Sequence, residues 1–238
     1  MSEADLPDGV AVVRIDQDHV RNAVNSATAE RLHDAFLAFD ADESQRVAVL
    51  TGDRQAFSAG ANLRDLPRLR DSGPLGPTRL QLSKPVIAAI EGWCVAGGVE
   101  LAAWCDLRVA GASARIGCLE RRWGVPLIDG GTYRLPQIVG LGRALDLILT
   151  GREIDAAEAE RMGFVNRVVP DGEALATAIA LAAEIASYPW RGVLNDRRSV
   201  YAGLGLGLEE ALAIEDELGR DTIFADRFRE GVARFDNR

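Results

Sequence analysis

The sequence has very few residues of the types that usually bind metals or act as nucleophiles. Its 238 residues include two histidines and three cysteines, and no two cysteines have CxxC spacing. This composition excludes the usual Cys/His zinc centres. Carboxylates could still bind Mg²⁺, but no cluster of them stands out in the sequence, so no metal site is expected. No apolar run approaches the roughly 20 residues that a membrane span requires. The acidic N-terminal residues lack the basic and apolar segments of a signal peptide, so we expect a cytoplasmic protein with no membrane partner.

Basic residues are outnumbered by acidic ones. There are 27 Lys and Arg against 36 Asp and Glu, which gives a formal net charge of −9. This balance argues against nucleic acid as a partner, because phosphate backbones are bound by basic surfaces. Lys84 is the only lysine, so an anionic ligand would have to be bound by arginines. The 47% hydrophobic content is enough for one substantial core.

Apolar runs alternate with helical segments over most of the chain, which predicts an α/β core. Residues 46–50 are nearly all apolar, as in a strand covered on both faces. Residues 26–40 have the apolar spacing of an amphipathic helix. Residues 65–83 are polar and contain several Gly and Pro, which predicts a mobile loop. Further strands are expected near 10–15, 85–90, 106–110, 114–116 and 164–169, and further helices from 97 and near 131–137, 141–149 and 155–162.

The chain changes character beyond about Asp171, where three helical stretches follow one another. Apolar residues recur there at helical spacing, as at Ala211, Ile214 and Leu218. We interpret this tail as a lid or an assembly surface.

Two stretches of small residues follow strand-like runs, at residues 56–63 and 95–101. Small residues let a ligand approach backbone N–H groups closely. Two such donors that converge on one oxygen would form an oxyanion hole. On composition alone, tight turns without a ligand are the favoured explanation of the glycines.

Several ordered motifs add to these two stretches, and together they are similar to the crotonase, or enoyl-CoA hydratase/isomerase, superfamily. The resemblance runs from about Val10 to Phe235. It implies a spiral of ββα units over residues 1–185, followed over 186–238 by a helical C-terminal region that builds homotrimers, often paired into hexamers. The motifs are Asn22–Ala23, Val49–Gly52, Phe57–Ala61, Lys84–Gly92, Gly97–Leu101 and Gly130–Thr132.

The resemblance also implies a chemistry in which two backbone N–H groups stabilise the enolate of a CoA thioester. Those donors correspond to Ala61 and Gly97. The hydratases of the family carry two glutamates, which correspond to Glu100 and Glu120. In that frame Glu120 handles the proton at C2, and Glu100 orients and activates the water. A member with only the second glutamate would resemble a double-bond isomerase.

The substrate would be an acyl-CoA thioester, and no cofactor beyond its CoA is expected. The resemblance places substrate contacts at Arg21, Ala59, Arg64 and Asp129, with the two arginines in the family's nucleotide-contacting regions. Arginine can bind phosphate with bidentate geometry, although exposed arginines are usually solvated.

Other interpretations of the acidic residues remain open. Glu100 could be an acid favoured by a helix N-terminus, and Glu120 could pair with Arg121 or Arg122 in a solvated cluster. Asp129 could cap the following helix or face a polar acyl substituent. If Asp129 faces the acyl group, the reaction would be that of an isomerase or of a dehydratase of a substituted acyl-CoA.

Two further classes are possible but weaker. A non-catalytic acyl-CoA-binding protein would be expected to lack one or both glutamates. A serine or cysteine hydrolase lacks support because Ser58 is not in a G-x-S-x-G context, and no histidine offers an evident base.

Overall fold

The computed structural model describes residues 6–224 and divides into two compact units, Met1–Ala182 and Ala183–Arg238. Positions 225–238 of the predicted C-terminal region, and the acidic residues 1–5, lie outside the described residues.

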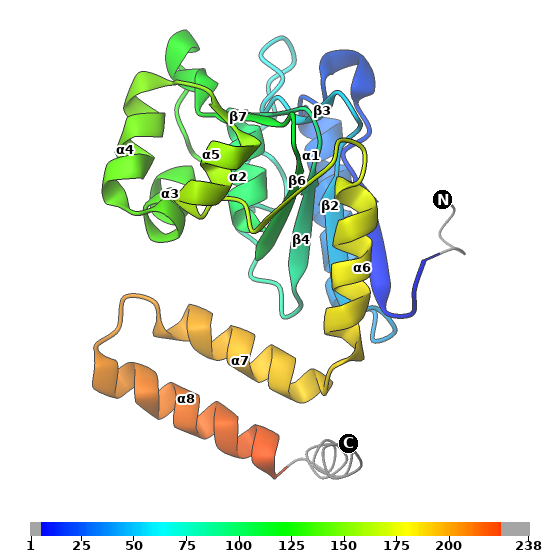
Figure 1. Cartoon of the computed structure of the whole chain (residues 1–238), viewed down its shortest axis with the longest axis vertical. Coiled ribbons are helices and arrows are strands. Elements are labelled where there is room, and N and C mark those ends of the chain that lie inside the picture. The colour runs from blue at the N-terminus through cyan, green and yellow to red at the C-terminus, as the bar shows by residue number, and fades with distance from the viewer. Residues whose placement is uncertain (1–5, 225–238) are drawn as a thin grey trace. The chain divides into compact units, whose positions relative to one another are not determined.

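The first unit is built around a five-stranded parallel sheet (Figure 1). Strand β2 is entirely buried, which agrees with its continuous apolar sequence. The strands, in spatial order, are β1 (Val10–Arg14), β2 (Val47–Thr51), β4 (Val86–Ile90), β6 (Leu107–Gly111) and β9 (Arg167–Val169).

A second sheet of four short strands accompanies the first. The chain passes from β2 to β3, from β4 to β5 and from β6 to β7, so each turn contributes one strand to each sheet. This arrangement confirms the predicted α/β spiral, although the strands of the second sheet are too short to give a clear apolar pattern. They are β3 (Ala56–Ser58), β5 (Trp93–Val95), β7 (Arg115–Gly117) and β8 (Ile154–Asp155), of which only β7 and β8 are antiparallel.

Helix α1 (Ser26–Ala41) follows the amphipathic pattern of its sequence. Its N-terminus is capped by Asn25, whose side-chain oxygen accepts a hydrogen bond from the Thr28 N–H at 3.0 Å. Leu32, Phe36 and Phe39 form its buried face. The other helices of this unit are the 3₁₀ helices η2 (Asp18–Val20) and η3 (Leu119–Trp123), and α2 (Gly97–Trp104), α3 (Gly131–Val139), α4 (Leu141–Thr150), α5 (Ala156–Met162) and the beginning of α6 (Ala174–Ser187).

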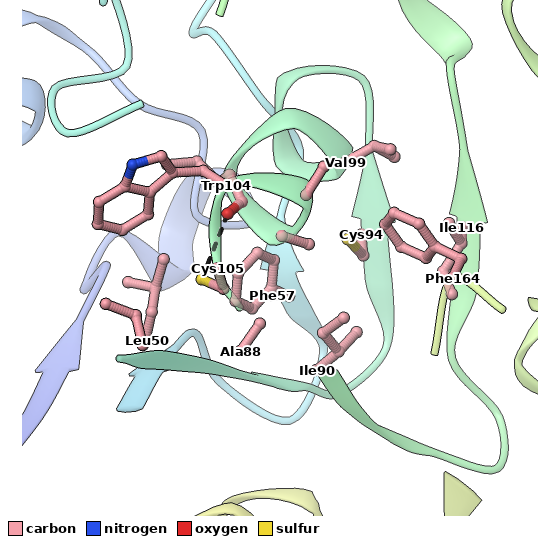
Figure 2. Packing of buried hydrophobic residues seen from close by; sticks show 14 of the residues in the cluster. Leu50, Phe57, Ala88, Ile90, Cys94, Val99, Trp104, Cys105, Ile116 and Phe164 are labelled. Carbon is pink, nitrogen blue, oxygen red and sulfur yellow. Dashed lines mark hydrogen bonds between the residues drawn. The ribbon is translucent and has the colours of Figure 1, made fainter. Parts of the chain in front are cut away.

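Helix α2 lies in the middle of the core, with all of its residues buried. Figure 2 shows Val99 and Trp104 of this helix among side chains from the strands, including Phe57, Ile90 and Ile116. Close packing on every side leaves α2 little freedom to shift. The fold therefore holds both ends of this helix rigidly.

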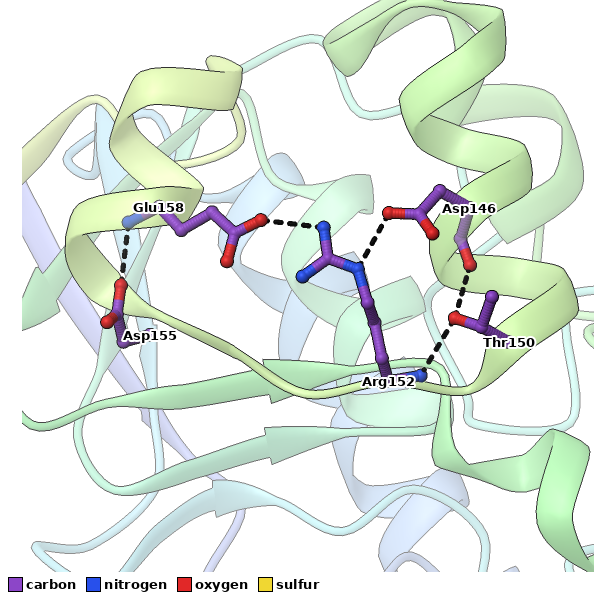
Figure 3. Close-up of polar contacts among 5 residues, drawn as sticks. All are labelled: Asp146, Thr150, Arg152, Asp155 and Glu158. Carbon is purple, nitrogen blue, oxygen red and sulfur yellow. Dashed lines mark hydrogen bonds and ion pairs between the residues drawn. The ribbon is translucent and has the colours of Figure 1, made fainter.

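Arg152 joins the end of α4 to α5 (Figure 3). Its guanidinium forms ion pairs at 2.6 Å with Asp146 of α4 and with Glu158 of α5. Asp155 caps α5 by accepting the Glu158 N–H at 2.7 Å. Partly exposed ion pairs contribute only up to about 1 kcal/mol each. Their effect here is to fix the C-terminal end of α4, which contacts the site described below.

The second unit contains helices α7 (Trp190–Gly203) and α8 (Leu208–Ile223), which form an antiparallel hairpin (Figure 1). Arg191 pairs with Asp221, and the Asn195 amide donates to the Leu218 carbonyl at 3.1 Å. The three predicted helical stretches thus correspond to α6, α7 and α8. Within residues 6–224, no helix combines the length and the hydropathy needed to cross a bilayer.

Residues 73–78 are buried, although they belong to the segment for which the composition predicts a mobile loop. Leu75 is 1% exposed and Thr78 is fully buried. This loop folds onto the segment that precedes α3, through bonds described in the next subsection.

Candidate functional site

The two small-residue stretches meet through their backbones. Gly60 has a φ of +83°, and a methyl group added to it would lie 2.5 Å from the Gly97 nitrogen. A methyl group added to Gly97 would lie 3.2 Å from the Gly60 Cα and 3.6 Å from the Ala61 nitrogen. Only glycine allows such an approach at residue 60, where the backbone is also left-handed. The structure therefore brings Ala61 and Gly97 together, as the sequence suggested.

The Ala61 N–H points away from the segment at Val24, with which Ala61 pairs. Val24 forms a parallel bridge with Ala61, in which the Val24 N–H donates to Gly60 and the Val24 carbonyl accepts from Asn62. In a parallel ladder the residue between two such bonds turns its own N–H to the opposite side. Among residues 6–224, no acceptor receives a hydrogen bond from this N–H.

The Gly97 N–H is placed by an unusual backbone conformation in the preceding residue. Ala96 has φ 53° and ψ −128°, a conformation that L-residues rarely adopt. Gly97 is the first residue of α2, where N–H groups have no partner within the helix and where the helix dipole favours negative charge. Within the described part of the chain this N–H donates to no acceptor either. Two unpaired donors thus lie side by side.

Glu100 stands in the first turn of α2 and is 3% exposed. One carboxylate oxygen, Oε1, accepts the N–H of Asp129 at 2.9 Å and that of Gly131 at 2.8 Å. Burial raises the pKa of Glu100 to about 7, and the negative charges of Asp129 and Glu120 act in the same direction. At neutral pH this carboxyl group can therefore either accept or hold a proton.

Glu120 is a buried carboxyl group that has no hydrogen-bond partner. It lies in η3, is 4% exposed, and neither carboxylate oxygen bonds to any other atom of residues 6–224. Burial raises its pKa. An unpaired buried polar group costs about 1–3 kcal/mol, which makes Glu120 a candidate functional residue.

The neighbouring arginines do not bind Glu120. Arg121 donates to the Ile148 carbonyl at 3.3 Å, and Arg122 donates to the Gly151 carbonyl at 3.1 and 2.8 Å. The alternative in which Glu120 pairs with these arginines is therefore wrong. Instead, both tether the turn that carries Glu120 to the C-terminal end of α4.

Asp129 does not cap α3. The N-cap residue is Gly130, with a φ of +98° and no side-chain cap. The Asp129 Oδ1 atom instead accepts the Leu75 N–H at 3.0 Å and a hydrogen bond from the Thr78 hydroxyl. Burial raises the pKa of Asp129. The residue therefore joins the buried loop to the segment that also donates to Glu100.

The proposed nucleotide contacts lie at the surface. Arg21 and Arg64 are exposed, and Ala59 is partly buried. The Arg21 carbonyl accepts the Ala59 N–H at 3.0 Å, which brings the backbone of this arginine next to the strand end that leads to Ala61. Arg64 donates its own N–H to Asn62 at 3.0 Å.

The structure offers no support for a hydrolase. The Ser58 hydroxyl is fully buried, donates to the Asn22 carbonyl at 2.8 Å and accepts the Gly60 N–H at 3.1 Å. It fixes the turn before Ala61 and is not positioned as a nucleophile. The three cysteines are buried, and burial raises the pKa of each, so their reactive thiolate form is disfavoured.

Two residues of the site are not marked by any sequence motif. Leu75 packs beside the donor pair, since a methyl group on Gly97 would lie 2.6 Å from its Cδ1 atom. Thr78 binds Asp129 from the same loop. Both lie in a segment whose Gly and Pro content conceals its burial, so composition could not identify them.

Comparison with known proteins gives consistent matches over almost the whole chain. Residues 5–238 match the model of the enoyl-CoA hydratase/isomerase family. A probable enoyl-CoA hydratase of Rhizobium meliloti (strain 1021) is 36% identical over 95% of this chain and 91% of its own. The short-chain-enoyl-CoA hydratase of Clostridium acetobutylicum is 37% identical over 95% and 90%. The crystal structure of an enoyl-CoA hydratase from Mycobacterium tuberculosis H37Rv superposes with a TM-score of 0.92 at 32% identity and covers 97% of this chain and 93% of that one.

Proposed function

Because the chain belongs to the enoyl-CoA hydratase/isomerase family, we propose that it is an enoyl-CoA hydratase, which adds water across the C2=C3 bond of an acyl-CoA thioester. The relatives named above as hydratases support this choice within the family. One observation carries it: Glu100 is buried in the first turn of the helix that begins with the Gly97 donor, and the charge of a second buried carboxyl group, the unpaired Glu120, raises its pKa.

In the proposed reaction, the thioester oxygen binds to the N–H groups of Ala61 and Gly97. Attack of water at C3 moves negative charge onto this oxygen and gives an enolate. Mutational removal of one side-chain donor from an oxyanion hole costs about 3–4 kcal/mol, and we expect each backbone donor to contribute on the same scale. The N-terminus of α2 adds a favourable dipole at the same position.

The two glutamates divide the proton transfers. Glu100 accepts one proton from the attacking water, whose oxygen forms the new bond to C3. Glu120, in its protonated form, donates a proton to C2 as the enolate collapses. The raised pKa values support these roles, since a general acid or base works best when its pKa lies near the working pH. Proton exchange with solvent then restores both groups.

The substrate's CoA supplies the only carrier group that this reaction needs, so no separate cofactor takes part. Arg21 and Arg64 are exposed cations suited to bind its phosphates. Replacement of either arginine by Ala is expected to raise the KM for the acyl-CoA and to leave kcat nearly unchanged. A change in kcat alone would argue against a phosphate contact.

The decisive experiment measures the loss of the conjugated thioester absorbance of crotonyl-CoA. The wild-type protein is expected to hydrate it, and Glu120→Gln is expected to remove nearly all turnover while binding of the thioester persists. Glu91→Gln is the control for a Glu-to-Gln exchange at a buried position outside the site; unlike Glu120, Glu91 accepts two backbone N–H groups, from Gly172 and Ala174. Turnover that survives in Glu120→Gln, or is lost equally in the control, would contradict the assignment.

The same fold could support a double-bond isomerase or a dehydratase of a substituted acyl-CoA. The presence of both glutamates favours hydration, because isomerisation requires no activated water. Conversion of a 3-enoyl-CoA to its 2-enoyl isomer, without hydration of crotonyl-CoA, would favour the isomerase.

We further propose that the protein is cytoplasmic and forms a homotrimer or a dimer of trimers. Three free buried cysteines are consistent with a reducing compartment. The hairpin of α7 and α8 exposes large apolar residues, among them Leu208 and Leu212, which suits an assembly surface. Sedimentation equilibrium would measure the mass, and a monomer would contradict this proposal.

A further inference from the structure

We propose that Asp129 is a positioning residue that fastens the loop of residues 73–78 against the donor pair, and thereby holds the apolar side chain of Leu75 beside Gly97. The loop and the segment before α3 are joined by what we term the Asp129 clamp, formed by Leu75, Thr78 and Asp129. The effects of the clamp on kcat and KM described below rest on the proposed hydratase function.

The bonds of the clamp converge on one carboxylate oxygen. The Asp129 Oδ1 atom accepts both the Leu75 N–H and the Thr78 hydroxyl. All three residues are at most 3% exposed. A carboxylate that accepts hydrogen bonds away from water holds its partners more firmly than a neutral acceptor does. The side chain is therefore committed to the loop.

Two arginines brace the same junction from outside. Arg134 donates to the Asp129 carbonyl at 3.0 Å and to the Thr78 carbonyl at 2.7 Å. Arg79 donates to the Ile128 carbonyl at 2.7 Å. The loop and the segment before α3 are thus bound to each other by side chains from both sides of the junction. These arginines also place positive charge near the buried carboxylate.

The clamp contacts two parts of the site, the donor pair and Glu100. On one side, Leu75 occupies the space next to Gly97, where any added methyl group would collide with it. On the other side, the N–H of Asp129 itself donates to Glu100. Asp129 therefore links the Leu75 side chain, which lies beside the oxyanion donors, to Glu100, the carboxyl group that activates water.

This arrangement assigns a task to a residue that the sequence left ambiguous. If Asp129 faced the acyl group, its carboxylate would interact with a polar substituent of the substrate. Because its Oδ1 atom already binds the loop, its main effect on the reaction passes through the position of Leu75, while its negative charge also raises the pKa of Glu100. Displacement of reacting groups by about 1 Å can lower a rate by about 100-fold.

The test compares two substitutions at one position. Asp129→Ala removes both acceptor bonds and is expected to lower kcat for crotonyl-CoA by about tenfold to 100-fold, with a change of less than about threefold in KM. Asp129→Asn keeps an oxygen that can accept from Leu75 and Thr78, so it is expected to restore kcat to within about threefold of wild type. Glu91→Gln again serves as the control and should leave kcat unchanged.

A double-mutant cycle shows whether Asp129 acts through Leu75. In a Leu75→Ala background, the fold-decrease in kcat caused by Asp129→Ala is expected to be less than about a third of the fold-decrease in the wild type. The reason is that the Leu75 side chain beside Gly97 is already absent. Multiplicative effects of the two substitutions would overturn the proposal. Equal damage from Asp129→Asn and Asp129→Ala would also overturn it, since the charge would then act directly.

Hydrogen exchange tests the clamp without turnover. Asp129→Ala should accelerate exchange of the Leu75 amide, and unchanged exchange would contradict the clamp whatever the reaction is. If Asp129→Ala does not fold, Thr78→Val removes one bond and keeps the side-chain shape. It should lower kcat and leave KM nearly unchanged, and wild-type kcat would count against the proposal. A wild-type protein that fails to hydrate any enoyl-CoA would instead refute the proposed function.

Discussion

Glu100→Gln should make the protein more stable at alkaline pH and less active. Glu100 is buried, and burial raises its pKa from the usual 4.5 to about 7, with the nearby charges of Asp129 and Glu120 adding to the effect. Glutamine has the same shape and keeps an oxygen that can accept the N–H groups of Asp129 and Gly131. The substitution therefore removes the buried charge and preserves its hydrogen bonds.

The sign and size of the effect follow from the two pKa values. The folded state binds the proton of Glu100 more tightly than the unfolded state, so the free energy of unfolding falls as pH rises from about 4.5 to about 7. Above pH 7 the loss is complete and amounts to about 3 kcal/mol, since one pH unit corresponds to about 1.4 kcal/mol. The free energy of unfolding of the Gln variant does not fall in this way, because glutamine does not ionise.

Urea unfolding at pH 4.5 and pH 8, at one protein concentration, measures the difference. We expect the variant and the wild type to differ little at pH 4.5, and the variant to be up to about 3 kcal/mol more stable at pH 8. Glu160→Gln, at an exposed position, controls for the side-chain exchange itself. Turnover of crotonyl-CoA should fall by about 100-fold or more because the general base is lost. An equal stability difference at both pH values would refute the reasoning.

Three other substitutions test the surroundings of the site. Gly60→Ala places a methyl group 2.5 Å from the Gly97 nitrogen, so kcat should fall by about 100-fold; a loss below about twofold would contradict the donor geometry. Arg122→Met removes the bonds to the Gly151 carbonyl and should lower kcat about tenfold, with partial recovery in Arg122→Lys; unchanged kinetics would show that the tether is not needed. Ala96→Gly relieves an unfavourable backbone conformation and should raise the free energy of unfolding by about 1 kcal/mol in a denaturant titration, whereas a decrease would show that Ala96 is not strained.

The sequence predicted those elements whose periodicity is strong. Helix α1 and strand β2 were expected within one or two residues of their bounds, because a long amphipathic pattern and a continuous apolar run are unambiguous. Of the strands of the second sheet, only β7 was expected, near 114–116; the others are at most three residues long and carry no comparable signal. The turn that carries Glu120 was missed for the same reason, since η3 spans only Leu119–Trp123.

The site was predictable where it depends on backbone and motif, and not where it depends on packing. The glycines near Ala61 and Gly97 indicated a close approach of two segments of the chain, and the structure contains this approach. The bonds of Asp129 connect residues more than 50 positions apart in the sequence, and no local pattern reveals them. Two apparent roles, the cap by Asp129 and the pairing of Glu120 with arginines, were plausible locally and are absent from the described structure.

The central claim is that two backbone donors polarise the thioester oxygen of the substrate. Infrared difference spectroscopy on crotonyl-CoA, labelled with ¹³C at the thioester carbonyl and bound to Glu120→Gln, measures this directly, because the complex should persist without turnover. The carbonyl stretching band is expected to move to lower wavenumber on binding, and Gly60→Ala in the same background is expected to reduce the shift. A carbonyl band that stays at its position in free crotonyl-CoA would show that the two donors do not polarise the thioester.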